Sequence, residues 1–197
     1  MSISAKDVME LRKTTGAGMM DCKKALLETN GDRDAAVKYL REKGISKAAQ
    51  KAERTTREGL IYSYIHANGK LGVLLEMNCE TDFVARNEIF VELCKNVAMH
   101  IAATNPLAID ETGLDQAKIA EESEIYRNKA LNDGKPEKIV DRIVAGQIDK
   151  YKKTNCLLSQ EFVKDPDRTV QDIITDAIVT LGENIQLGRF VRYSLGA

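Results

Sequence analysis

The sequence predicts an α+β protein that begins with helices and continues as an antiparallel sheet with helices, interrupted by a helical hairpin. Short amphipathic helical patterns separated by glycines fill residues 1–44. Two runs of strand-forming residues flank Asn68-Gly69, which is the strongest short-range signal for a β-hairpin. Strand and helix patterns return after two charged helical segments in residues 115–153. The core is therefore expected to contain an insertion.

Residues 1–44 are predicted to form a small module of three helices, because glycines break the helical pattern twice. The helices are expected to end before Gly16, to run from Met19 to Asn30, and to run from Asp34 to Lys43. The basic, alanine-rich residues 45–57 are predicted to form a linker helix.

The third of these helices carries its own boundary signals. Asp32 is a suitable N-cap, and Gly44 is expected to stop the helix. The residues expected to face inward are Ala36, Val37 and Leu40.

Residues 58–114 and 154–197 are predicted to form the α+β core. Strands are expected at 59–66 and 71–77, followed by a helix with the apolar stripe Phe90, Leu93, Cys94, Val97, Ala98 and Ile101. The second part is expected to form a strand at 156–163, a turn at 165–167, a helix along 170–181 and a strand at 184–195. In that last strand Ile185, Leu187, Val191 and Tyr193 are expected to share one side.

Residues 115–153 are predicted to form an antiparallel helical arm with legs at Asp115–Leu131 and Pro136–Lys153. At 1.5 Å per residue, each leg would reach about 25 Å. A thin apolar seam is expected, with Ile119, Ile125, Tyr126 and Ala130 facing Ile139, Ile143 and Ile148.

The composition does not favour a nucleic-acid-binding, membrane or metal-binding protein. Twenty-nine basic and thirty acidic residues give a net charge of −1, which does not favour nucleic-acid or membrane binding. No apolar run approaches the roughly 18 residues of a membrane span, and the N-terminus lacks a signal core, so a cytoplasmic protein is expected. The four cysteines are widely spaced without a CxxC pair, which predicts free thiols and no metal site.

Three features could suggest other chemistry. Gly16-Ala17-Gly18 follows a helix, so it indicates a helix-breaking turn more than a phosphate loop. His66 and His100 have no nucleophile nearby in sequence, although a small enzyme that pairs one of them with a cysteine remains a rival hypothesis. Residues 38–57 hold seven basic and two acidic residues, which fits a solvated face, a docking surface for an acidic protein, or RNA contact.

The segment 81–87 joins a strand to a helix, and Thr81 or Asp82 can cap that helix. Phe83 then has two interpretations. It either folds onto its own helix as a hydrophobic staple, or it projects from a rigid turn to enter a partner. The residues alone favour the first, because buried aromatic side chains outnumber exposed anchors.

Several segments resemble the elongation factor Ts family. They read TGAGMMDCKKAL at 15–26, YIHANGK at 64–70, NCETDFVARNE at 78–88, GKPEKI at 134–139 and FVKD at 162–165. Together they cover essentially the whole chain in order. The resemblance implies a ubiquitin-associated-like module at 1–44, then the α+β core, with a coiled-coil arm at 115–153.

The resemblance also implies a function in translation elongation. It implies a guanine-nucleotide exchange factor that binds elongation factor Tu carrying GDP and promotes GDP release so that GTP can bind. No covalent chemistry, catalytic residue, cofactor or metal of its own is implied, because the metal and the nucleotide belong to the partner. No direct nucleic-acid or membrane partner is implied either.

The residues implied to contact the partner's GTPase domain, near its magnesium and nucleotide site, are Arg12, Met19, Met20, Thr81, Asp82, Phe83 and Val84. The resemblance thus reverses the reading of Phe83, which we expect to be at least partly exposed. Longer family members carry two core subdomains, whereas this chain has one. A homodimer is therefore expected, with strand 184–195 in its interface.

Overall fold

The computed structural model describes residues 3–196 and combines helices with antiparallel sheet, as predicted. These residues form two compact units. The first contains residues 3–63, Leu74–Asn96 and Asp172–Phe190, and the second contains Tyr64–Val73, Val97–Gln171 and residues 191–196. The division cuts through strands and one long helix, so each unit holds part of the same sheet.

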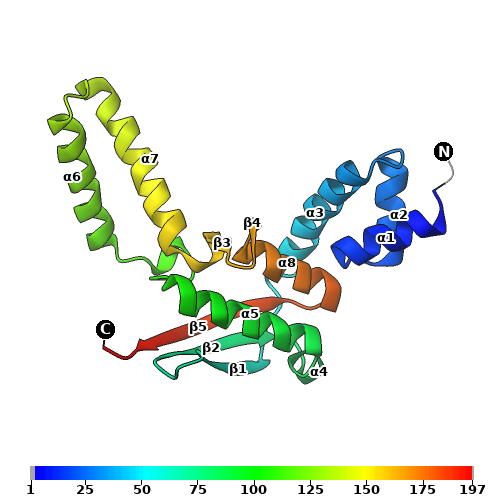
Figure 1. The fold of residues 1–197 in the computed structure, drawn as a ribbon. Coiled ribbons are helices and arrows are strands. Elements are labelled where there is room, and N and C mark those ends of the chain that lie inside the picture. The colour runs from blue at the N-terminus through cyan, green and yellow to red at the C-terminus, as the bar shows by residue number, and fades with distance from the viewer. Residues whose placement is uncertain (1–2, 197) are drawn as a thin grey trace. The chain divides into compact units, whose positions relative to one another are not determined.

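Three helices at the N-terminus form a small bundle in the first unit (Figure 1). They are α1 (Ala5–Thr15), α2 (Met19–Glu28) and α3 (Arg33–Ala49). Ser4 and Asp7 form a capping box on α1, and Asp32 caps α3 as predicted. The buried core of this bundle consists of Val8, Leu11, Ala17, Cys22, Ala25, Leu26 and Ala36.

The predicted end of the third helix is wrong, because α3 continues through Gly44 to Ala49. Gly44 is buried, and a Cβ atom placed on it would lie 3.4 Å from a methyl carbon of Val179. The glycine therefore allows close packing of two helices and does not stop one. Val37, expected to face inward, is exposed.

Strands β1 (Glu58–Ile65), β2 (Leu71–Cys79) and β5 (Ile185–Ser194) form a three-stranded sheet in the order β1-β2-β5. The hairpin predicted at Asn68-Gly69 is confirmed. The N–H of His66 donates to the carbonyl of Leu71 at 2.8 Å, and Gly69 supplies the positive φ of 71° that the turn needs.

Contrary to the prediction, the apolar residues of β5 do not all face one side of the sheet, because the buried side changes along the strand. Ile185 is buried, whereas Val191 and Tyr193 are exposed. Arg192 instead turns inward and donates from Nε to the carbonyl of Ala102 at 3.1 Å. A strict alternation read from sequence cannot detect such a change of phase.

A one-turn helix and a long helix follow β2. They are α4 (Asp82–Ala85) and α5 (Glu88–Thr104), separated by a break at which Asn87 Oδ1 accepts the N–H of Ile89. The predicted apolar stripe of α5 is confirmed, because its six members are all buried: Phe90, Leu93, Cys94, Val97, Ala98 and Ile101.

The arm lies in the second unit and consists of α6 (Gln116–Asn132) and α7 (Glu137–Asn155), side by side in Figure 1. A short 3-10 turn, η1 (Glu111–Gly113), precedes it. The seam differs in phase from the prediction, since Ile125 and Ile139 are exposed. Ile119 packs instead against a separate buried cluster that consists of Ala108, Leu114 and Cys156. The residues that fill the seam are Ala130, Val140 and Val144, with Tyr126, Ile143 and Ile148 packed against them.

The chain then forms η2 (Leu157–Ser159), β3 (Glu161–Phe162), β4 (Asp165–Thr169) and α8 (Val170–Leu181). In the segment predicted as a strand at 156–163, Leu157–Ser159 form a 3-10 turn and Glu161–Phe162 a short strand, and the turn predicted at 165–167 is part of β4. The turn is closed by the N–H groups of Ser159 and Gln160, which donate to the carbonyls of Cys156 and Leu157 at 3.0 and 3.2 Å, so local turn bonds override the strand formers here.

His100 is buried in the second unit and fully engaged. Its Nδ1 accepts the N–H of Val163 at 3.3 Å, and its Nε2 lies 2.8 Å from Gln160 Oε1. Because Nδ1 is the acceptor, Nε2 carries the proton and donates to Gln160. Burial lowers the pKa of His100 from 6.5, although the bond to Gln160 opposes that effect.

We predict that acid destabilises the protein through His100. A depressed pKa means that the unfolded chain takes up the proton first, so this stability is full above about pH 6.5 and is lost as pH falls. Thermal unfolding at pH 7.5 and 5.5, as rough end points, should show a decrease that His100→Gln reduces. The exposed His66 offers a control, because His66→Gln should leave the decrease in place. An identical pH dependence for wild type and His100→Gln would contradict the assignment.

Candidate functional site

The most distinctive surface feature of the first unit is the turn that carries Phe83. Thr81 is the N-cap of α4, and its hydroxyl accepts the N–H of Val84 at 3.4 Å. Phe83 itself is 83% exposed. The expectation that Phe83 would be exposed is confirmed, and the staple interpretation is wrong. A large aromatic side chain without cover is a common mark of a protein contact.

The neighbours of Phe83 hold the turn in place. Val84 is only 9% exposed and points into the protein, so its side chain supports the turn from beneath and is not displayed. Asp82 forms an ion pair with Arg86, one helical turn later, at 3.2 Å. Of the predicted contact residues in this turn, Phe83 is therefore the one that offers a large apolar surface.

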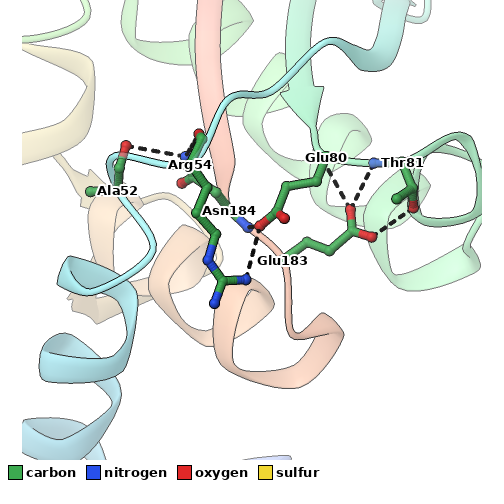
Figure 2. A network of polar contacts seen from close by, with 6 residues as sticks. All are labelled: Ala52, Arg54, Glu80, Thr81, Glu183 and Asn184. Atoms are coloured by element: carbon green, nitrogen blue, oxygen red, sulfur yellow. Dashed lines mark hydrogen bonds and ion pairs between the residues drawn. The ribbon is translucent and has the colours of Figure 1, made fainter.

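A network of polar contacts, shown in Figure 2, attaches this turn to a distant part of the chain. The carboxylate of Glu183, between α8 and β5, accepts the backbone N–H groups of Glu80 and Thr81 at 3.1 and 3.0 Å. It also accepts the hydroxyl of Thr81 at 2.6 Å. In return, Glu80 accepts the backbone N–H of Asn184 at 2.6 Å.

The same network reaches the chain that leaves the N-terminal helices. The amide of Asn184, which is 2% exposed, donates to the carbonyls of Ala52 and Arg54 at 3.2 and 2.8 Å. Arg54 forms an ion pair with Glu80 at 3.4 Å. Sequence analysis missed Glu80, Glu183 and Asn184 as site residues. Glu80 lies within the segment 78–88 but was not singled out there, and Glu183 and Asn184 belong to no motif.

A second candidate surface lies on α1 and α2. A groove there is lined by Lys6, Met9, Glu10, Arg12, Lys13 and Met19. Met9 and Met20 are strongly exposed, and Met19 is partly exposed. Flexible thioether side chains suit adaptable protein contacts, and cationic groups border them here. The structure thus exposes all three residues predicted in this module: Arg12, Met19 and Met20.

An ionic cluster stabilises the helix that carries Met19 and Met20. Asp21 forms ion pairs with Lys43 and Lys47 of α3, each at 2.8 Å. The hydrogen bonds from Lys43 and Lys47 lower the pKa of Asp21. The start of α2 is therefore fixed against α3.

The basic segment at 38–57 is largely used within the protein. Arg41 pairs with Asp172 at 2.7 Å, and Lys43, Lys47 and Arg54 have the partners described above. Burial lowers the pKa of Lys51. These engaged cations disfavour the interpretation of the segment as an RNA-binding stripe.

The rival hypothesis of a cysteine enzyme gains no support from the thiols. All four cysteines are free and buried. Burial raises the pKa of Cys79 to about 11 and that of Cys94 to about 12. The nucleophile in such chemistry is the thiolate, which these environments suppress. Within residues 3–196, no cluster of His, Cys, Asp and Glu has the arrangement of a metal site.

Among the described helices, none is both long enough and apolar enough to span a membrane.

Comparison with known proteins gives a consistent result. The model of the family described as elongation factor TS matches residues 5–197. Elongation factor Ts from Oleidesulfovibrio alaskensis is 60% identical over 196 residues, covering 100% of this chain and 99% of the relative. The protein of the same name from Nitratidesulfovibrio vulgaris is 57% identical over 197 residues, covering 100% and 98%. That from Moorella thermoacetica is 53% identical over 194 residues, covering 98% and 96%.

Proposed function

Because the chain belongs to the elongation factor Ts family and so has a role in translation elongation, we propose that it is a guanine-nucleotide exchange factor. In this proposal it binds elongation factor Tu carrying GDP in the cytoplasm and promotes GDP release so that GTP can bind. The observation that carries the proposal is Phe83, an exposed aromatic side chain on a capped turn. The protein would act by binding alone and would perform no covalent chemistry.

Exchange of this kind follows from linkage between two binding events. If the factor weakens GDP binding to its partner, GDP must weaken factor binding by the same ratio. A ten-thousandfold effect, for illustration, corresponds to roughly 5.5 kcal/mol of coupling. One anchor residue typically contributes about 2–4 kcal/mol when truncated. Phe83 alone would therefore be insufficient, and a second contact is needed.

The groove on α1 and α2 supplies that second contact in our proposal. Met19 and Met20 would pack on the GTPase domain, and Arg12 would form a polar contact at the border of the groove. Phe83 would enter the same domain near the magnesium and phosphate end of its nucleotide site, with Thr81, Asp82 and Val84 holding the turn. The groove would mainly provide affinity, whereas Phe83 would disturb the nucleotide site.

We further propose that the protein works as a homodimer. β5 is an edge strand of its sheet, and Val191, Tyr193 and Leu195 leave apolar surface exposed along it and just beyond it. Exposed strand edges and apolar patches favour association, and a second copy placed by a two-fold axis would cover them. Each chain would present its own Phe83, which gives a complex of two factors with two partners.

The first prediction concerns Phe83→Ala. Stimulated release of labelled GDP from elongation factor Tu should fall by about 30-fold or more, the equivalent of a lost anchor residue. The melting temperature should stay within about 2 °C, because an exposed side chain contributes little to stability. Phe90→Leu is the matched control. Phe90 is fully buried, so this variant should lose stability. Full exchange activity in Phe83→Ala would refute the role of Phe83.

The second prediction separates affinity from maximal rate. Met20 is 76% exposed, so Met20→Glu should fold normally. The factor concentration that gives half-maximal exchange should rise about tenfold, because a charge is placed in an apolar contact. The rate at saturation should change less. Val37→Glu, at an exposed apolar position on α3, serves as the control. Equal behaviour of the two variants would argue against a contact through Met20, which follows the groove residue Met19 on α2.

The third prediction concerns assembly. Light scattering at micromolar concentration should give a mass of about 44 kDa, twice the 21.9 kDa of one chain. Tyr193→Glu should shift the mass toward the monomer, because it places a charge in the proposed interface. Ile125→Glu, an exposed position on the arm, should not do so. A wild-type mass near 21.9 kDa with exchange activity intact would mean that one chain suffices.

A further inference from the structure

Phe83 has little packing of its own to fix its direction. Its side chain is almost fully exposed, and α4 consists of only four residues. An isolated helical turn is unstable without outside support, because too few hydrogen bonds compensate the ordered backbone. The hydrogen bond that caps α4 is also long, at 3.4 Å. Apart from the buried side chain of Val84 beneath the turn, the direction of Phe83 therefore depends on contacts made by the backbone around it.

Glu183 makes the hydrogen bonds that hold the backbone just before Phe83. Its Oε2 accepts the N–H groups of Glu80 and Thr81, and its Oε1 accepts the hydroxyl of Thr81. One carboxylate thereby holds two consecutive peptide groups and the capping side chain, two residues before Phe83. Hydrogen bonds to an ionised acceptor are about twice as strong as neutral ones.

We propose that Glu183 is a positioning residue for nucleotide exchange: it fixes the turn at 80–84 so that Phe83 points toward the partner. This inference rests on the proposed function and deepens it. Glu183 would touch neither nucleotide nor partner, and it would act through Phe83 alone. The attachment is reciprocal. Glu183 accepts hydrogen bonds from the backbone at 80–81, and Glu80 accepts one from the backbone of Asn184.

The same network also includes the segment that follows the N-terminal helices. Asn184 follows Glu183 directly and holds the carbonyls of Ala52 and Arg54, where the chain leaves the N-terminal helices. Arg54 returns to Glu80 through an ion pair. The segment that follows α3 and the turn of Phe83 thus meet in one network (Figure 2). A change at Glu183 would loosen the turn without removing any residue from the groove.

A double-mutant cycle distinguishes positioning from general stabilisation. Glu183→Ala should lower the saturating rate of GDP release about tenfold, because a misdirected anchor loses its geometry. The half-saturating concentration should change less, since the groove is intact. In the Phe83→Ala background, Glu183→Ala should cause no further loss of rate. Glu183→Ala should lower the melting temperature by the same amount in the wild-type and Phe83→Ala backgrounds, because its effect on stability does not depend on Phe83.

A spectroscopic measurement tests the turn directly, without the partner. The chain contains no tryptophan, so Phe83→Trp places a single reporter on the turn. Adding Glu183→Ala should lower the fluorescence anisotropy of that tryptophan, because the turn becomes mobile on the nanosecond timescale. Glu183→Gln should restore much of the anisotropy, since its amide oxygen can still accept the two backbone N–H groups. Glu124→Ala, at an exposed position on the arm, should leave both rate and anisotropy unchanged.

The outcomes separate this inference from the proposed function. Unchanged anisotropy when Glu183→Ala is added to Phe83→Trp, or an equal loss of rate in the Phe83→Ala background, would overturn the positioning role. If the wild-type protein fails to accelerate GDP release, the proposed function and the role of Glu183 in exchange both fail. A fall in anisotropy would in that case show only that Glu183 orders the turn.

Discussion

Two carboxylates, Glu80 and Glu183, each accept backbone N–H groups from the segment that carries the other. These reciprocal hydrogen bonds let the four-residue helix α4 keep its direction while the side chain of Phe83 stays exposed to water. Val84 anchors the turn in the core, but packing over Phe83 itself would bury the side chain that we propose meets the partner. Charge-assisted hydrogen bonds to the backbone solve that problem, because they need no cover over the side chain.

The N-terminal helices follow a related design. Their small core consists of valine, leucine, alanine and cysteine side chains, and Met9 and Met20 lie outside it. Asp21 then fixes the start of α2 against α3 through Lys43 and Lys47. In both places, polar contacts hold the backbone while apolar side chains remain exposed. Such surfaces are rare in monomeric proteins unless they bind something.

Regular elements followed well from the sequence, and irregular ones did not. The stripe of α5 and the turn at Asn68-Gly69 were predictable because periodicity and turn chemistry are local properties. Gly44 was read as a helix stop because glycine usually ends helices, but its role is close packing against Val179. The seam of the arm shifted from Ile139 to Val140 because neighbouring apolar residues compete for one face.

The sequence by itself determined the family and the α+β class, since long motifs and local patterns carry that information, and its resemblance to the family marked the turn at Phe83 as a candidate contact. Only the tertiary structure decided that Phe83 is exposed, that Val84 lies beneath it and that Glu183 holds the turn. Glu183 and Thr81 are separated by 102 positions along the chain. Contacts between such distant residues arise from the packing of whole elements, which no local pattern of residues specifies.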